Sequence, residues 1–134
     1  MADDVKEEVE GAVRKLDSGT QWLLRRELER LPEILRRDER IVEIAHGVVE
    51  EDPGMVVATD GRLVFLHEGL SRRRMEEFPY DRITTVKAEK SVVKSMLTVS
   101  AGDQEVAIHR IYPKDRTLAL TDPMRQAGIK VVKE

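Results

Sequence analysis

The sequence predicts an α+β fold in which a helical hairpin precedes about seven short antiparallel strands and one closing helix. Apolar residues have helical spacing up to about residue 40, strand-like spacing over 40–111, and helical spacing again after Tyr112-Pro113. Short turn motifs separate most of the strand-like segments. Antiparallel strands in this number are enough to curl into a barrel or sandwich, and a lone terminal helix would plug one open end.

The N-terminal segment has the pattern of an antiparallel helix pair. Two sets of apolar residues recur at helical spacing, Val5, Val9, Val13 and Leu16 in the first and Leu24, Leu28, Leu31 and Leu35 in the second. Ser18 and Gln21 have the spacing of a capping box between the two helices. We expect helices over about 4–17 and 19–31, with Pro32 ending the second or beginning one more short turn. Residues 1–37 would then be an extension of a barrel domain, 38–134.

Seven segments have strand character. They span residues 40–49, 55–59, 62–67, 75–80, 82–88, 95–101 and 105–111. Asp60-Gly61 predicts a type I′ hairpin turn, in which both positions have positive φ, and Gly102-Asp103 predicts a second tight turn. A seam of apolar residues predicts the closing helix, which Pro123 should kink or split. The tail, 129–134, is expected to fray or to pair locally.

Composition excludes several classes of function. The chain of 134 residues has no cysteine, which excludes a disulfide scaffold, a cysteine-based zinc site and a thiol nucleophile. The net charge is −3, without the basic excess of a nucleic-acid-binding protein. The acidic start lacks the apolar core of a signal peptide, and no apolar stretch is long enough to span a membrane. We therefore expect a cytoplasmic protein.

Catalytic, metal and cofactor motifs are absent from the sequence. His46, His67 and His109 fall in separate predicted strands, without the spacing of metal ligands. There is no Gly-x-Ser-x-Gly nucleophile motif, and the glycines are too dispersed for a phosphate-binding loop. We expect no enzymatic activity, no metal and no cofactor.

Four segments, in their order along the chain, carry a resemblance to a known family. They are Leu31-Pro32-Glu33-Ile34-Leu35, Asp38-Glu39-Arg40-Ile41, Val57 to Phe65 (VATDGRLVF) and Phe78 to Val86 (FPYDRITTV). Over roughly residues 30–127 the chain resembles the bacterial pleckstrin-homology-like domains, in particular the YokE-like PH domain family. The resemblance implies a seven-stranded, strongly bent sheet capped by a C-terminal helix, and a binding scaffold without catalysis. It does not imply a ligand, because fold does not fix function.

Basic loops are the first candidate binding residues. Eukaryotic members of this superfold hold phosphoinositides with basic residues between the first two strands, but this chain has Glu50-Glu51-Asp52 there, which would repel such a headgroup. Arg72, Arg73 and Arg74 follow the third strand, and we expect the acidic loop to neutralise them. A second basic set is expected at the opposite end of the barrel. It comprises Lys87, Lys90 and Lys94.

Apolar residues are the second kind of candidate. Leu70, beside the arginines, either anchors a partner or folds back on the barrel, and Trp22 lies near the start of a helix. The leading hypothesis is a binding or scaffolding module that recognises a protein segment or itself, through an edge strand or the helical hairpin, with contacts from Trp22, Leu70 and Arg72 to Arg74. The alternative is a peripheral adaptor that binds anionic lipid or phosphate through the basic loops.

Overall fold

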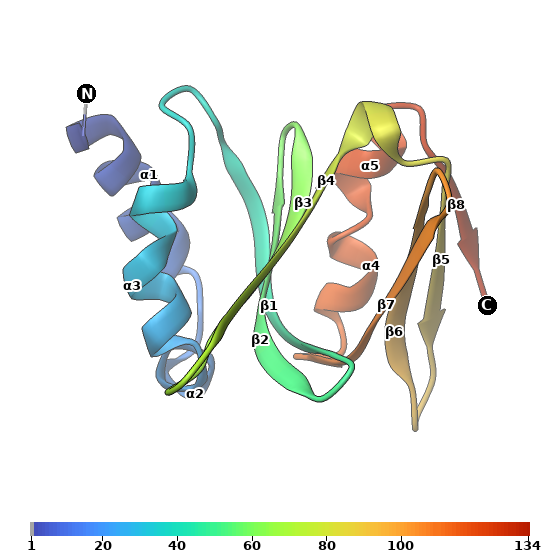
Figure 1. Ribbon diagram of the computed structural model, residues 1–134, viewed down its shortest axis with the longest axis horizontal. Helices are drawn as coiled ribbons and strands as arrows, with labels where there is room; N and C mark the ends of the chain where they lie inside the picture. The colour runs from blue at the N-terminus through green and yellow to red at the C-terminus, as the bar shows by residue number, and fades with distance from the viewer. Residues whose placement is uncertain (1) are drawn as a thin grey trace.

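The computed structural model describes residues 2–134 and has the predicted α+β order of elements (Figure 1). The α-helices are α1 (Ala2–Arg14), α2 (Ser18–Leu23), α3 (Arg25–Ile34), α4 (Arg116–Ala119) and α5 (Asp122–Gln126). The strands are β1 (Ile41–Val49), β2 (Asp52–Thr59), β3 (Arg62–Glu68), β4 (Arg73–Pro79), β5 (Thr85–Lys90), β6 (Ser95–Ala101), β7 (Gln104–Tyr112) and β8 (Lys130–Lys133). A short 3-10 helix, η1 (Tyr80–Arg82), joins β4 to β5.

The N-terminal helical region contains three helices where the sequence predicted two. Asp17 is the N-cap of α2, because its carboxylate accepts hydrogen bonds from the backbone N–H of Thr20 at 3.1 Å and from the Thr20 hydroxyl at 2.6 Å. The predicted capping box of Ser18 and Gln21 is therefore wrong. The Gln21 amide instead donates to the carbonyls of Val13 and Leu16, at the end of α1.

The break between α2 and α3 falls at Leu24, whose side chain is fully buried. Pro32 neither ends a helix nor begins one, contrary to our expectation. It lies in the last turn of α3, which continues to Ile34. Because a proline has no backbone N–H, the carbonyl of Leu28 accepts no helical hydrogen bond from residue 32.

The strands form one unclosed sheet in the order β4-β3-β2-β1-β7-β6-β5-β8. The pairs are antiparallel except for β8, which runs parallel to β5. The tail thus pairs locally, as one of the two expected outcomes, and adds an eighth strand to the seven predicted. β4 and β8 are the two edges.

The β2–β3 hairpin turns at Asp60-Gly61 as predicted, but the turn is not of type I′. Neither residue has positive φ, and the side chain of Thr59 holds the turn instead. The Thr59 hydroxyl accepts hydrogen bonds from the backbone N–H groups of Gly61 at 3.2 Å and Arg62 at 3.0 Å. At the β6–β7 turn Gly102 has a φ of 61°, a conformation that glycine adopts without strain.

The molecule has four layers, visible from left to right in Figure 1: α1 to α3, the β1–β4 half of the sheet, α4 and α5, and the β5–β8 half. One apolar core lies between the two halves of the sheet and includes Leu120 and Met124 of the C-terminal helices. A second core joins α1 and α3 to β1, β2 and β3 through Leu31 among others. The N-terminal helices therefore pack on their own sheet.

The C-terminal helical segment is split in two, as Pro123 predicted. Pro123 lies in the first turn of α5, where its missing N–H costs no helical hydrogen bond. The pair α4 and α5 lies between the sheet halves rather than over one end of a closed barrel (Figure 1).

Candidate functional site

A polar network is buried where α3 meets the β2–β3 hairpin. Arg62, only 3% exposed, donates to the Glu39 carboxylate from Nε at 2.7 Å and from Nη2 at 2.9 Å. Its Nη1 donates to Glu77 at 2.8 Å, and Nη2 also donates to the carbonyl of Ile34, at the end of α3, at 2.9 Å. The Thr59 hydroxyl donates to Glu39 at 2.7 Å.

This buried network is electrostatically complementary. Burial raises the pKa of Glu39, but hydrogen bonds from the Arg62 side chain, the Arg36 backbone and Thr59 outweigh burial and hold the pKa below its ordinary value. Because the donors and acceptors are directed at each other, we assign the network a structural role. It ties the end of α3 to the sheet.

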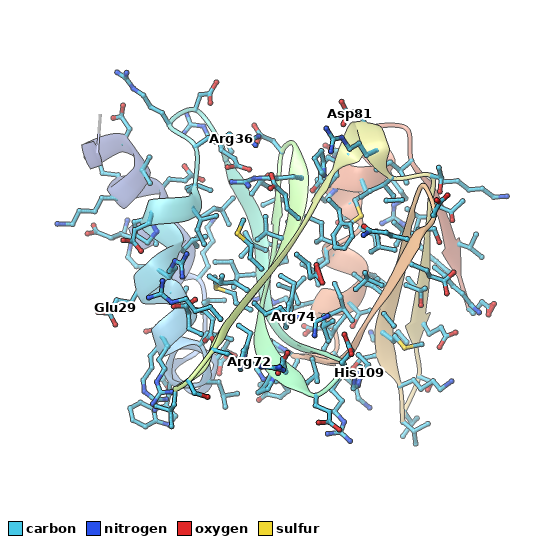
Figure 2. All side chains as sticks on the ribbon, in the orientation of Figure 1. Glu29, Arg36, Arg72, Arg74, Asp81 and His109 are labelled. Atoms are coloured by element: carbon cyan, nitrogen blue, oxygen red, sulfur yellow. The ribbon has the colours of Figure 1, made fainter. Side chains whose placement is uncertain are left out.

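The three candidate arginines are engaged with acidic side chains, as expected. Figure 2 labels two of them, Arg72 and Arg74. Arg72 and Arg74 both contact the carboxylate of Asp52, and Arg74 also pairs with Glu50 at 2.6 Å. Arg73 pairs with Glu68 at 3.2 Å. The hydrogen bond from Arg72 lowers the pKa of Asp52, so this carboxylate stays ionised at neutral pH.

The candidate lysines are also partly compensated. Lys87 lies 3.3 Å from Glu89 and 3.3 Å from Glu134, and Lys94 lies 3.5 Å from Glu89. Lys90 is exposed. The β5–β6 turn that carries Lys90 and Lys94 projects toward the same end of the molecule as the β3–β4 loop with its arginines, the lower end in Figure 1. Our expectation that the two basic sets lie at opposite ends is wrong.

The two candidate apolar residues are both exposed. Leu70 is 91% exposed, so it does not fold back on the barrel. Trp22 is 66% exposed and its ring stacks with the guanidinium of Arg25 at 3.8 Å. Leu70, Arg72 and Arg73 line one polar hollow between α3 and the β3–β4 loop, whereas Trp22 and Arg74 are not part of its lining.

A different surface gathers exposed apolar side chains into a concave site, which we call the α2–β7 groove. It has a volume of about 760 Å³ and is lined by Leu23, His46, Val93, Lys94, Ser95, Met96, His109, Arg110, Ile111, Tyr112 and Lys114. Leu23 on α2, Val93 in the β5–β6 turn and Tyr112 at the end of β7 are 51, 86 and 50% exposed. Three large apolar side chains thus meet water around one hollow.

The backbone beneath the groove is irregular. The β1–β7 register shifts between the pairs His46 with Tyr112 and Val48 with His109, which forms a bulge on β7. Arg110 in this bulge has a φ of 54°, in the left-handed region that side chains other than glycine seldom adopt. Gly47 lies opposite, where an added Cβ would approach Ile108 to 2.8 Å.

The groove contains two histidines in different environments. Burial lowers the pKa of His46, so its imidazole is neutral at neutral pH. His109, labelled in Figure 2, lies near the β1–β2 turn, with its Nε2 at 3.2 Å from the carbonyl oxygen of Glu50.

Sequence reasoning did not find this groove. Its lining comes from α2, β1, β6, β7 and two connections, which only the folded chain brings together. One feature of the sequence could have indicated an exposed apolar surface. Val92 and Val93 are consecutive apolar residues in a turn that otherwise carries polar and charged residues, Ser91 and Lys94.

A match between the sequence and a family profile identifies the family of the chain. A family profile described as Bacterial PH domain matches residues 35–125. The chain belongs to the bacterial PH domain family. No curated protein sequence matches the chain.

Two of the solved structures similar to this bacterial PH domain, the first two described below, share its fold. The C-terminal domain of an unknown protein from Leishmania infantum aligns with a TM-score of 0.58 at 16% identity, covering 75% of this chain and 97% of that one. The hSac2 domain from human phosphoinositide phosphatase Sac2 has a TM-score of 0.53 at 7% identity, with 82% and 86% covered. A DUF1696 family protein with a pleckstrin-homology domain from Shewanella loihica PV-4 has a TM-score of 0.49 at 19% identity, with 77% and 94% covered. At these identities the likeness concerns the fold alone.

Membership of the family supports a binding or scaffolding module, since PH domains are typically non-catalytic. The residues behind the resemblance include Glu39, Thr59 and Arg62, which belong to the buried network and so explain the fold rather than a ligand. Within the described part of the chain, no helix is long and apolar enough to cross a membrane. The same residues contain no group of three or more acidic, histidine or cysteine side chains that could hold a metal ion.

Proposed function

We propose that this bacterial PH domain binds a segment of a partner protein in the α2–β7 groove. The observation that carries the proposal is the convergence of Leu23, Val93 and Tyr112, each half-exposed or more, on one apolar hollow. Covering such side chains releases about 25 cal/mol for each Å² of apolar surface removed from water. A concave apolar site of this size suits one or two side chains of an inserted segment.

The electrostatic contacts favour a protein segment over an anionic lipid. Arg72, Arg73 and Arg74 each contact a carboxylate of their own chain, and Lys87 and Lys94 share Glu89. A lipid headgroup would have to displace these internal partners. The groove requires no such exchange, because its apolar side chains lie open.

The helical region takes part in the proposed site. Leu23 on α2 forms one wall, so the partner would contact the N-terminal helices and the β7 end of the sheet together. Trp22 and Leu70 do not line the groove, and Leu70 belongs to a separate hollow beside Arg72 and Arg73.

Selection of a random peptide library on the immobilised protein tests this proposal. Recovered peptides are measured by fluorescence anisotropy against the wild type and against Leu23→Gln combined with Val93→Gln. We expect the double substitution to weaken binding by about tenfold or more, because two exposed apolar contacts are lost. Both positions are surface-exposed, so folding should be preserved, which circular dichroism checks.

Leu70→Gln is the matched control, since Leu70 is equally apolar and more exposed but lies outside the groove. Peptides should bind this variant like the wild type. Recovery of no peptide, or equal binding to the groove variant, would refute the proposed function. Loss of binding on Leu70→Gln would move the site to the β3–β4 loop.

A further inference from the structure

The α2–β7 groove differs in charge from its surroundings. The chain has 26 acidic and 23 basic residues, yet the groove lining contains Lys94, Arg110 and Lys114 and no carboxylate. Four other grooves on the described surface each have at least two carboxylates in their lining. A cationic, apolar hollow is therefore a local feature of this site, on a protein whose net charge is negative.

Two of the groove's cations have no acidic partner among the side chains from residue 4 onward. Lys94 pairs with Glu89, whereas the Lys114 ammonium donates to the backbone carbonyls of Ser91 and Val92. The exposed guanidinium of Arg110 has no ion pair with any side chain from residue 4 onward. Arg110 can therefore meet an incoming carboxylate without breaking an existing contact.

The backbone conformation of Arg110 also supports a functional role for this residue. A left-handed φ at a residue with a side chain is unfavourable, and a glycine would adopt it freely. The bulge redirects the strand at the same residue. A cation thus lies at a strained backbone position on the edge of an apolar hollow, an arrangement typical of a functional site.

We infer that the segment bound in the groove is acidic and amphipathic, with a bulky apolar side chain packed against Leu23 and Met96 and a neighbouring carboxylate paired with Arg110. This inference rests on the proposed function and names the class of its partner. The apolar side chain would supply most of the binding, and the charge pairing would select the partner. An Arg–carboxylate contact that forms two parallel hydrogen bonds adds orientation as well as attraction.

The test uses peptides recovered from the random library, each remade with its acidic residues changed to the matching amides and, separately, to lysine. We expect the amide versions to bind the wild type about tenfold more weakly. The Arg110→Glu variant should bind the acidic peptides more weakly than the wild type does. It should bind the lysine versions more tightly, because reversing both charges restores the ion pair. Arg82→Glu is the matched control, since Arg82 is exposed on η1, at the opposite end of the molecule in Figure 1.

The outcomes separate this inference from the proposed function. Peptides that depend on Leu23 and Val93 but bind equally well as amides would overturn the acidic partner and leave the groove as the binding site. Peptides that bind independently of Leu23 and Val93 would overturn both. If Arg82→Glu and Arg110→Glu weaken the binding of acidic peptides equally, the effect comes from the net charge of the protein. That result would also overturn the inference.

Discussion

Among single residues, Arg62 and Glu39 should matter most for stability, because they form a buried ion pair between the helical region and the sheet. The change Arg62→Met removes one charge and leaves Glu39 buried without its main partner. Breaking a buried pair in this way costs about 3–5 kcal/mol of unfolding free energy. Urea denaturation followed by circular dichroism measures the loss.

Two further variants separate the buried pair from general effects of losing an arginine. Arg62→Met combined with Glu39→Gln should recover part of the stability, since no uncompensated charge stays buried. Arg82→Met, at an exposed arginine, should change stability little. A loss on Arg62→Met no larger than that on Arg82→Met would contradict the structural role of the network.

Arg110 combines an unfavourable backbone conformation with the proposed contact to ligand. Arg110→Gly and Arg110→Ala both remove the side chain, but only glycine relieves the φ of 54°. We expect the glycine variant to be more stable than the alanine variant by about 1 kcal/mol. Both should bind the recovered acidic peptides weakly. Equal stability of the two variants, measured by thermal denaturation, would show that the backbone at this position is not strained.

At the scale of elements, α3 is held to the sheet by its apolar face. Leu31 is almost completely buried in the core between the helices and β1 to β3. Leu31→Ala should therefore destabilise the protein by about 2–5 kcal/mol. Val92→Ala, at an exposed valine, is the control and should have almost no effect. Similar values for the two variants in urea denaturation would mean that the helical region contributes little to folding.

Much of the fold was predictable because local signals agree with tertiary structure. Asp60-Gly61 marked a hairpin between two apolar runs, and Pro123 marked the split in the closing helix. Other features depended on contacts that a local pattern does not contain. The tail 130–133 is a strand because β5 offers it an open edge, and the Asp60-Gly61 turn avoids positive φ because Thr59 holds it. The missing N–H of Pro32 predicted a helix boundary, but α3 continues past it to Ile34.

The candidate site was less predictable than the fold. The neutralisation of Arg72 and Arg74 by the acidic turn followed from their expected proximity, and the contacts with Asp52 and Glu50 confirm it. Leu23 and Tyr112 are distant in sequence and meet only because α2 packs near the β7 end of the sheet. Single exposed apolar residues are common on surfaces, so neither one predicted a groove alone.

At the scale of the whole molecule, the bend of the sheet brings the β1–β2, β3–β4 and β5–β6 connections and α2 toward one end (Figure 1). This is why the lysines of the β5–β6 turn share an end with the arginines of the β3–β4 loop. Around the β1–β2 and β3–β4 connections basic and acidic groups alternate, with Glu50 and Asp52 among the arginines. We expect this paired part of the surface to attract an anionic membrane only weakly.

Vesicle binding tests this view of the charged end. We expect the protein to stay in solution with vesicles of phosphatidylcholine and phosphatidylglycerol at about 0.15 M salt, where exposed charges are largely screened. Co-sedimentation measures binding. Sedimentation that disappears on changing Arg72, Arg73 and Arg74 together to alanine would favour the lipid adaptor. The same change at Lys87, Lys90 and Lys94 shows which of the two basic sets contacts the vesicle.

The most direct test of the α2–β7 groove is to map the binding site by NMR. Amide chemical shifts of the labelled protein are followed during titration with a peptide recovered from the random library. We predict that the largest shifts fall on Leu23, on 93–96 and on 109–112, the residues that line the groove. Shifts centred on the β3–β4 loop, 69–72, or on the β4 and β8 edges, with the groove unchanged, would contradict it.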